Sequence, residues 1–515
     1  MIDERSATRA DRLLPAVLVM IAIGLALRIA AARGGLWLDE AWSAKLAQEA
    51  GTPLGVFLHI NHDNNHHLNT LWMQFVGIGA PPLLARALSI ASGTIAIAVA
   101  ARIAAPRGMA AALVAATLFA LSPILVTYGS EARGYAPMIL ALLLAILIVD
   151  RWLAGANDPP ARRRVAWCFA LGALAQLTMV FGCVAIVGWA TFVEWRRHRS
   201  LAAAAGTVLR FFAPALVALG LVLGIVFGAA YASPTGFQFG RYDPFDFLLY
   251  LHGLVEMFGY TFGYPVVSLW VLAVAAIAVV LARGSATARF DLYWIAIVAF
   301  PVGMAVLRAG NVGNPRYFLL AGVALLLMLG DMIARGLAGR GGQRTVSAGM
   351  LAALVVGSVA QDADLIANQR GDPGAAIRAM AARAPAGADV ALDRATGLAM
   401  VETAAAQAHY RVVIRRGDCP AARFLFVDRF KGETPPATAA RCGKPYRAIA
   451  QARAHGMSGT HWTLFERADW TVTSPHASAA RPRASNATAP TASPPRRSAS
   501  RSAAIPRRSA GAAGR

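Results

Sequence analysis

Two adjacent carboxylates, Asp39 and Glu40, follow the first hydrophobic segment of the chain in the run LWLDEAWS. Ionisable side chains beside a membrane-buried cavity are energetically costly, so we treat them as a functional hypothesis by default. A carboxylate in such a place can serve as a general base. We therefore take Asp39 and Glu40 as candidate site residues. The alternative is that Asp39 only helps to hold its loop at the membrane interface.

The same loop continues into a polar stretch with four histidines, HINHDNNHHLNTLW. Imidazole and carboxylate groups are common metal ligands. The spacing matches no helix-face ligand pattern such as HExxH, so we predict neither a metal site nor a cofactor. We instead expect His66, His67 and Asn65 to contact a phosphate or an acceptor. A bound divalent metal and a solvated loop held by its own hydrogen bonds are the alternatives.

Two later loops contribute arginines. YGSEARGYAP contains Glu131 and Arg133, and GNVGNPRYFLL contains Arg316 and Tyr317 at the start of a late apolar segment. A guanidinium pairs well with a phosphate, and a nearby carboxylate can orient it or a sugar. We expect these four residues to bind the phosphate or sugar of a ligand. The alternatives are a Glu131–Arg133 pair at the membrane surface and an Arg316 side chain that extends to lipid headgroups.

The elements that must position these loops are predicted to be membrane helices. Of 515 residues, 57% are hydrophobic and 15% are charged, which is too apolar for a soluble protein of this length. Apolar windows long enough to cross a membrane recur from Leu13 to about Ala360. We interpret the apolar run Ala166–Trp195 as two short antiparallel helices that turn near Thr178–Gly182, which gives about 11 crossings. One long tilted helix there would invert everything downstream.

The placement of arginines predicts the orientation, because basic residues in short loops stay on the cytoplasmic side. Arg5, Arg9 and Arg12 place the N-terminus in the cytoplasm. The candidate residues then lie in external loops, and an odd number of crossings leaves the C-terminal region outside. The expected external loops span residues 33–82, 127–135, 232–264 and 308–317.

We predict three regions: a transmembrane domain over residues 1–360, a small extracytoplasmic α/β domain over 361–470 and a disordered tail over 471–515. In the second region GDPGAAIRAMAARAPAGADV is helix-like, and VALDRA, RFLFVDRF and HWTLFERA are strand-like. Cys419 and Cys442 suggest a disulfide in an oxidising compartment. The tail is rich in Arg, Ser, Pro and Ala but lacks aromatic residues for stacking, so we expect no nucleic-acid partner despite the net charge of +22.

Taken together, LWLDEAWS, NNHHLNTLW, YGSEARGYA and NPRYFLL resemble motifs of the C-type (GT-C) membrane glycosyltransferases. More narrowly, they are similar to bacterial family 39 proteins, the group related to protein O-mannosyltransferases and the lipid A aminoarabinose transferase. The resemblance implies a hexosyl- or pentosyltransferase of the bacterial inner membrane that uses a polyprenyl-phosphate sugar, often without metal. The acceptor would be a glycolipid, a polysaccharide or a protein.

The resemblance also implies site roles. Asp39 matches the first-loop aspartate that acts as catalytic base in the family, with Glu40 beside it. Many relatives carry a basic residue and two prolines where this chain has HHLNT, and His67 is the nearest candidate for that donor contact.

Two other classes of function fit the same residues. A transporter or flippase for a lipid-linked or anionic solute would use these charges as a binding site, but transporters often show repeats and helices broken at the midplane. Here the charges gather in loops predicted on one face, which favours chemistry at a surface. A non-catalytic membrane scaffold would make Asp39 dispensable.

Overall fold

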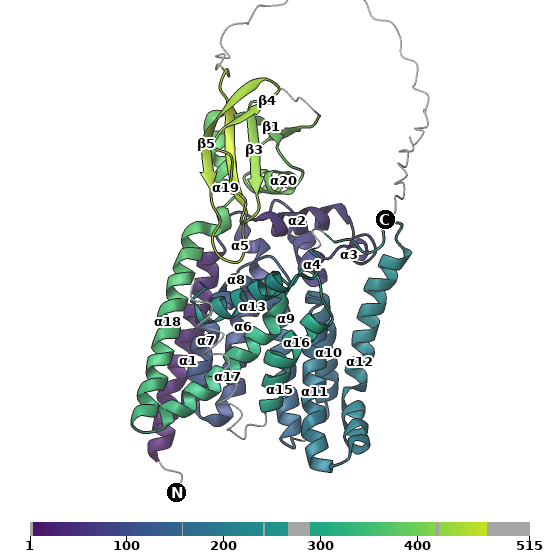
Figure 1. The fold of residues 1–515 in the computed structure, drawn as a ribbon, viewed down its shortest axis with the longest axis vertical. Coiled ribbons are helices and arrows are strands. Elements are labelled where there is room, and N and C mark those ends of the chain that lie inside the picture. Colours follow the sequence, from purple (N-terminus) through teal and green to yellow (C-terminus); the bar gives the residue numbers. More distant parts are fainter. Residues whose placement is uncertain (1–3, 157, 240–242, 266–288, 418–421, 471–515) are drawn as a thin grey trace, which may run out of the picture. The chain divides into compact units, whose positions relative to one another are not determined.

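The computed structural model describes residues 4–470, except 157, 240–242, 266–288 and 418–421. Residues 4–470 belong to one compact unit made of a helical bundle and a C-terminal sheet domain (Figure 1). The predicted disordered tail at 471–515 and the apolar run at 266–284 lie outside the described residues. The fold class is therefore the predicted one, a helical membrane protein with a small α/β domain.

Seven helices in the described part of the chain are long and apolar enough to cross a membrane. They are α1 (Glu4–Ala31), α6 (Ala87–Ala104), α9 (Tyr135–Leu153), α11 (Met179–His198), α12 (Leu201–Ala232), α17 (Leu319–Ala338) and α18 (Gly342–Asn368). Shorter bundle helices are α7 (Met109–Leu121), α10 (Ala161–Ala175), α15 (Phe290–Trp294), the π-helical η2 (Ile295–Ala299) and α16 (Phe300–Val306). The expected total of about 11 crossings stays a prediction.

The apolar run 166–195 is divided as expected. α10 ends at Ala175 and α11 begins at Met179, so the turn lies slightly before the predicted position. Among the spans, α17 is the most enclosed, with 89% of its apolar window buried, whereas only 22% of the α1 window is buried. α17 therefore lies at the centre of the bundle, and α1 leaves most of its apolar surface for lipid.

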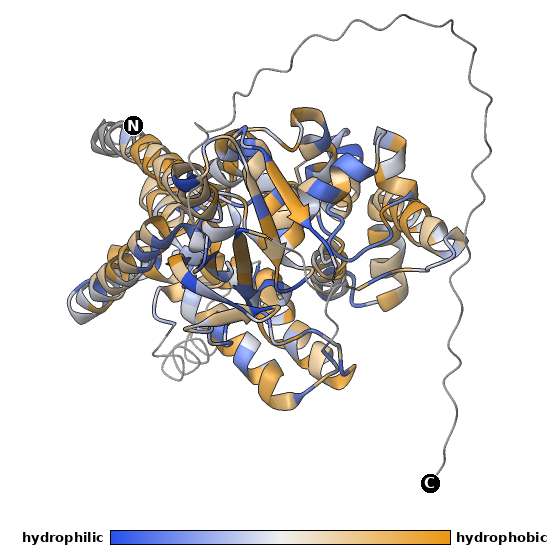
Figure 2. Cartoon of the chain, turned by 90° about the horizontal axis from the view of Figure 1, so that it is seen from above, coloured by the Kyte–Doolittle hydropathy of each residue, from blue (hydrophilic) through white to orange (hydrophobic). Residues whose placement is uncertain are grey.

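Short helices and loops crowd the end of the bundle next to the sheet domain (Figure 1). These helices are α2 (Leu38–Glu49), α3 (Pro53–Leu58), α4 (His67–Val76), α5 (Pro82–Ala85), α8 (Pro123–Tyr128) and α13 (Phe247–Phe262), with single turns η3 (Pro315–Phe318) and η4 (Gln369–Gly371). A further single turn, η1 (Ala105–Arg107), joins α6 to α7 at the opposite end. Seen from above, hydrophilic loops (blue) run between largely hydrophobic helices (orange) in Figure 2. The end next to the sheet domain therefore carries the polar sequence motifs.

One of these short helices begins at a break that a buried arginine stabilises. Pro123 starts α8 and has no N–H, so the carbonyl of Phe119 loses its normal helical donor. Arg28 of α1, 1% exposed, supplies the replacement: its Nη2 donates to Phe119 O at 3.1 Å and its Nη1 to Ala120 O at 3.3 Å. Arg28 thereby fixes the chain direction just before the YGSEARGYAP motif.

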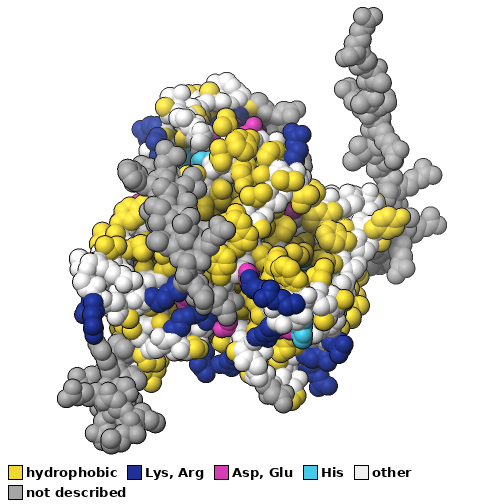
Figure 3. Space-filling view, turned by 60° about the horizontal axis from the view of Figure 1, so that its bottom comes forward, with side chains coloured by type: hydrophobic (Ala, Val, Ile, Leu, Met, Phe, Trp, Pro, Cys, Tyr) yellow, Lys and Arg dark blue, Asp and Glu magenta, His cyan; other side chains and the backbone are white. Residues whose placement is uncertain are grey.

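The opposite end of the bundle is rich in Lys and Arg (dark blue), as Figure 3 shows. Some of these side chains close a buried network in which Asp331 of α17 pairs with Arg107 at 2.6 Å and accepts a hydrogen bond from Tyr293 at 2.6 Å. Arg289 pairs with Asp150 at 3.1 Å in the same network. The predicted membrane orientation stays a prediction.

The C-terminal domain has a six-stranded sheet of order β2-β1-β3-β6-β5-β4. β1, β2 and β3 are parallel, and β6, β5 and β4 continue antiparallel from β3. The elements are α19 (Gly374–Arg383), β1 (Ala388–Leu392), α20 (Gly397–Gln407), β2 (Val412–Arg415), β3 (Phe424–Arg429), β4 (Ala439–Arg441), β5 (Lys444–Ala452) and β6 (His461–Arg467). The three strand-like runs correspond to β1, β3 and β6. α18 continues to Asn368, beyond the predicted domain boundary at residue 360.

Cys442 is disulfide-bonded, and Cys419 lies outside the described residues.

α2 belongs to the core of this domain as well as to the bundle. Its buried residues Leu38, Ala41 and Ala44 share one hydrophobic cluster with Met400 of α20 and Trp462 of β6. Lys45 of α2 adds an ion pair to Glu402 of α20 at 2.6 Å. The helix that carries the candidate base is therefore packed directly against the C-terminal domain.

Candidate active site

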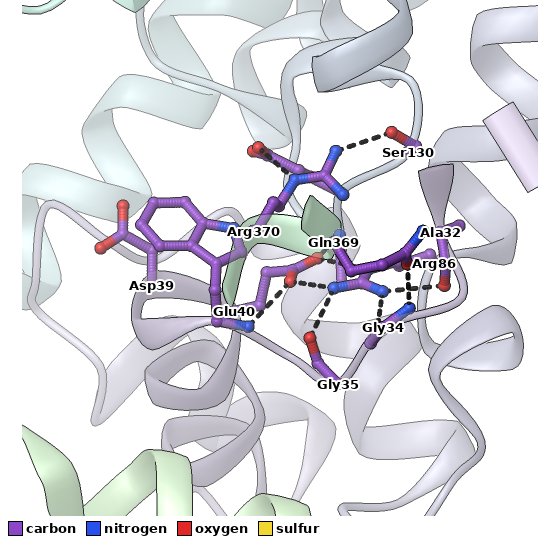
Figure 4. Close-up of polar contacts among 12 residues, drawn as sticks. Ala32, Gly34, Gly35, Asp39, Glu40, Arg86, Ser130, Gln369 and Arg370 are labelled. Atoms are coloured by element: carbon purple, nitrogen blue, oxygen red, sulfur yellow. Dashed lines mark hydrogen bonds and ion pairs between the residues drawn. The ribbon is translucent and has the colours of Figure 1, made fainter. Parts of the chain in front are cut away.

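The two carboxylates of the LWLDEAWS motif lie in the first turn of α2 and point in different directions (Figure 4). The backbone N–H of Trp37 donates to Glu40 Oε2 at 3.2 Å, which satisfies one free donor at the start of the helix. The carbonyl of Asp39 accepts hydrogen bonds from Ser43 Oγ at 3.0 Å and Asn64 Nδ2 at 3.1 Å. The helix start is thus fixed both locally and to the histidine-rich loop.

Glu40 is fully buried and has a complete set of partners. Arg86 binds it with two donors, Nε to Oε1 at 2.8 Å and Nη2 to Oε2 at 2.5 Å, and Ala132 N donates to Oε1 at 2.6 Å. Burial favours the neutral carboxyl, but the charge and hydrogen bonds of Arg86 outweigh it and lower the pKa of Glu40. Glu40 is therefore an enclosed carboxylate that holds α2 in place.

Asp39 has the opposite environment. Its side chain is 25% exposed, and its Oδ2 lies 2.7 Å from Arg133 Nη1 and accepts a hydrogen bond from Arg316 Nη1 at 3.0 Å. Residues from three motifs that are far apart in sequence thus meet at one carboxylate oxygen. The predicted convergence of Arg133 and Arg316 on the Asp39 region is present in this geometry.

Arg133 is 3% exposed, and hydrogen bonds fix both its backbone and its side chain. Ser89 Oγ donates to its carbonyl at 2.9 Å, and its Nη2 donates to the hydroxyl of Tyr135 at 3.2 Å. Gly134 follows, where a Cβ atom would lie 1.7 Å from the carbonyl oxygen of Ala175. Only glycine allows the YGSEARGYAP loop to pack this closely on the end of α10.

Arg316 and Tyr317 lie in the single turn η3, which starts α17. The guanidinium of Arg316 lies 5.7 Å from the centre of the Tyr317 ring. The preceding loop is held through Asn311, whose Oδ1 accepts from Asp243 N at 2.7 Å and whose N donates to Asp243 O at 2.8 Å. The long loop that the sequence left without a role therefore supports Arg316.

The two histidines of the first loop are both buried. His66 Nδ1 lies 3.2 Å from Ala175 O, its ring meets Tyr135 edge-on, and its Nε2 has no hydrogen-bond partner among the described residues. Burial, reinforced by the charge of Arg133, lowers the pKa of His66 well below its usual value. His67 stacks on Phe57 at 5.1 Å between ring centres, and burial lowers its pKa to about 4. Burial thus favours the neutral form of both rings, and the charge of Arg133 acts on His66.

Glu131 points away from Asp39. Its side chain is 1% exposed, and its Oε1 pairs with Arg370 Nε at 3.3 Å rather than with Arg133. Burial raises the pKa of Glu131 in spite of the charge of Arg370. A direct contact between Glu131 and a ligand would require this enclosed pair to open.

Sequence reasoning missed Arg86 and Arg370, the partners of the two buried acids. Arg86 lies in PPLLARALS between α5 and α6, where an arginine ahead of an apolar run is typical of an ordinary membrane boundary. Arg370 follows α18 and carried no motif. The available signal was the number of acids, because each buried carboxylate requires a cationic partner elsewhere in the chain. In the described ranges no three His, Cys, Asp or Glu side chains gather as metal ligands.

The chain matches no protein-family model and no curated protein. Solved structures with a similar fold include apo ArnT from Cupriavidus metallidurans, which is 11% identical over 87% of this chain and 97% of that chain, with a TM-score of 0.48. ArnT bound to undecaprenyl phosphate gives 11% identity, the same coverage and a TM-score of 0.46. The archaeal oligosaccharyltransferase AglB from Archaeoglobus fulgidus, in complex with an inhibitory peptide and a dolichol-phosphate, is 12% identical over 81% of this chain and 69% of that chain, with a TM-score of 0.46.

We predict that Gly134→Ala destabilises the protein by about 1–3 kcal/mol, because the new methyl group must displace the Ala175 carbonyl. Gly220→Ala on α12 is the matched control: a Cβ there meets nothing within 4 Å, and alanine favours the helix. Thermal unfolding in detergent measures both. Equal melting temperatures for Gly134→Ala and wild type would contradict the packing described here.

A second prediction concerns pH. Because His67 has a pKa of about 4 in the folded protein and an ordinary value of 6.5, the unfolded chain binds more protons between these values. Stability should fall as the pH drops from 6.5 towards 4, by about 3 kcal/mol in total from this residue. His67→Gln should flatten the dependence of melting temperature on pH over that window. An unchanged slope would show that His67 is not the titrating group.

Proposed function

We propose that the chain is a membrane glycosyltransferase that moves a sugar from a polyprenyl-phosphate donor to an extracytoplasmic acceptor, with Asp39 as the base. The observation that carries the proposal is the shared contact of Arg133 and Arg316 with the partly exposed Asp39. It puts a proton acceptor and two cations within one site, which is the combination that displacement of a phosphate requires.

The charge balance of the site supports an anionic ligand. Glu40 is matched by Arg86, and Glu131 is matched by Arg370. Two guanidinium groups therefore share the single carboxylate of Asp39, and a phosphate would supply the missing negative charge with geometry suited to arginine.

An apolar cavity beside Arg316 supports a lipid-linked donor. This small cavity lies between α9, α11 and the start of α17. Apart from Arg316 and Tyr317, its lining is mainly apolar and consists of Met138, Leu142, Thr178, Met179, Phe181, Gly182, Leu319 and Leu320. We infer that these apolar walls mark where the isoprenoid part of the donor enters, next to the cation that its phosphate needs.

In the proposed reaction the donor phosphate competes with Asp39 for Arg133 and Arg316. The released carboxylate takes the proton of the acceptor hydroxyl. At the same time the oxygen of that hydroxyl bonds to the sugar carbon. The bond between that carbon and the phosphate oxygen breaks, and the electron pair stays on the polyprenyl phosphate. The two arginines stabilise this departing anion.

Asp39→Asn tests the base. We expect turnover of a polyprenyl-phosphate sugar to fall by about 10²–10⁴-fold, since the amide cannot accept the proton. Glu49→Gln, which neutralises an exposed acid at the far end of α2, is the control and should keep wild-type turnover. Mass spectrometry of donor, product and hydrolysed sugar measures the reaction. Full activity of Asp39→Asn would refute the assignment, and donor translocation without cleavage would support a flippase.

Arg316→Met tests the phosphate contact. Loss of a charge-assisted contact should raise the donor KM and lower kcat/KM by roughly 10–100-fold, with the acceptor KM unchanged. Arg308→Met removes an exposed arginine near the same loop, which lies 6.0 Å from the Phe245 ring, and should have little effect. Steady-state kinetics with donor and acceptor varied separately distinguishes these cases. An increase in the acceptor KM alone would assign Arg316 to the other substrate.

A further inference from the structure

The C-terminal domain reaches the candidate active site through Arg370, which lies in η4 between α18 and α19. The side chain is 1% exposed, and its four contacts all lie in the bundle (Figure 4). It pairs with Glu131 at 3.3 Å and donates to Ala31 O at 2.7 Å, Thr127 O at 3.0 Å and Ser130 Oγ at 2.7 Å. One guanidinium therefore joins the end of α1, the YGSEARGYAP loop and the start of the C-terminal domain.

The loop between β5 and β6, residues 453–460, reaches the same acid. Ser458 is 4% exposed, and its side chain favours the charged form of Glu131, which acts to lower the pKa of that carboxyl. Its neighbour Met457 packs against the hydrophobic core of the bundle. Thr460 N donates to the Arg370 carbonyl at 3.3 Å, so this loop is hydrogen-bonded to the turn η4 that joins α18 to α19. Glu131 thus receives two partners from a domain that begins more than 230 residues later.

The junction itself is held in an unusual backbone conformation. Gln369, Arg370 and Asp372 have φ angles of 49°, 58° and 31°, a region that costs free energy for residues with a side chain. Such a conformation persists only where surrounding contacts over-determine it. Here Gly34 N donates to Gln369 Oε1 at 2.5 Å and Gly35 N to Asp372 Oδ1 at 2.7 Å, both from the segment that leads into LWLDEAWS.

The residues beyond Glu131 connect it to the reactive groups. Ala132 N donates to Glu40 at 2.6 Å, and Asn69 Nδ2 donates to Ala132 O at 2.6 Å. Arg133 N donates to Glu131 O at 2.8 Å, which forms a tight turn. A displacement of Glu131 must therefore move Ala132 and Arg133, and Arg133 is the group that meets Asp39.

We propose that Arg370 and Ser458 are positioning residues: by fixing Glu131, the C-terminal domain sets the orientation of Arg133 at Asp39. The C-terminal domain is then a working part of the transfer site. This inference rests on the proposed function for its kinetic effect, whereas the coupling of the domain to residues 127–135 is independent of it.

The test uses the full chain with Ser458→Ala, which removes one hydroxyl, and Arg370→Lys, which keeps the charge but loses the planar fork. We expect kcat to fall about tenfold in Ser458→Ala and further in Arg370→Lys, with the acceptor KM kept within about twofold. Hydrogen–deuterium exchange over residues 127–135 should become faster in both. Arg394→Lys, at the Arg394–Glu433 pair of 2.7 Å in the same domain, is the control and should change neither measurement.

A double-mutant cycle shows whether the effect passes through Glu131. In a Glu131→Gln background the charge-assisted interaction with Ser458 is already lost, so adding Ser458→Ala should change kcat less than about twofold. Additive losses would overturn the inference. So would unchanged exchange over 127–135 in Ser458→Ala, or faster exchange confined to residues 374–470. If the wild type transfers no sugar, the proposed function fails, and the exchange measurement still decides whether the domain is coupled to the loop.

Discussion

The arrangement at the candidate site depends on the buried ion pair between Glu40 and Arg86. Arg86 also donates to the carbonyls of Ala32, Gly34 and Gly35, so one guanidinium fixes the end of α1, the start of α2 and the beginning of α6. The pair is fully enclosed, where loss of one partner would leave an uncompensated charge. Adjacent residues of one motif thus divide the work: Glu40 fixes the helix, which leaves Asp39 partly exposed for chemistry.

Buried charges elsewhere in the protein follow the same rule. Glu131 is matched by Arg370 at the domain junction, and Asp331 is matched by Arg107 and Arg289 at the opposite end of the bundle. Each pair joins elements distant in sequence, because a bundle with apolar helix surfaces gains specificity from the few polar groups that must meet. The contact of Asp39 with Arg133 and Arg316 differs, because one carboxylate faces two guanidinium groups and is partly exposed to solvent.

The sequence was sufficient to predict the helical membrane class, the divided apolar run at 166–195 and the strands β1, β3 and β6, because each has a strong hydrophobic pattern. The meeting of Asp39, Arg133 and Arg316 also followed from their loops lying at one predicted face. The partners of Glu40 and Glu131 did not follow, since a membrane-boundary arginine looks the same whether it faces lipid or a buried acid. His67 was expected at a ligand, but its ring packs on Phe57, a contact fixed by the tertiary fold.

The hydrogen bonds of Arg28 have a consequence for how the chain enters the membrane. Its acceptors Phe119, Ala120 and Leu125 lie 91, 92 and 97 residues later, although Arg28 itself belongs to the first helix to be synthesised. During synthesis the guanidinium therefore reaches the bilayer well before these acceptors exist, and it must stay near water or lipid phosphate until α7 arrives. Completion of α1 as a membrane helix is thus tied to the insertion of α7, which makes these two helices a single unit of assembly.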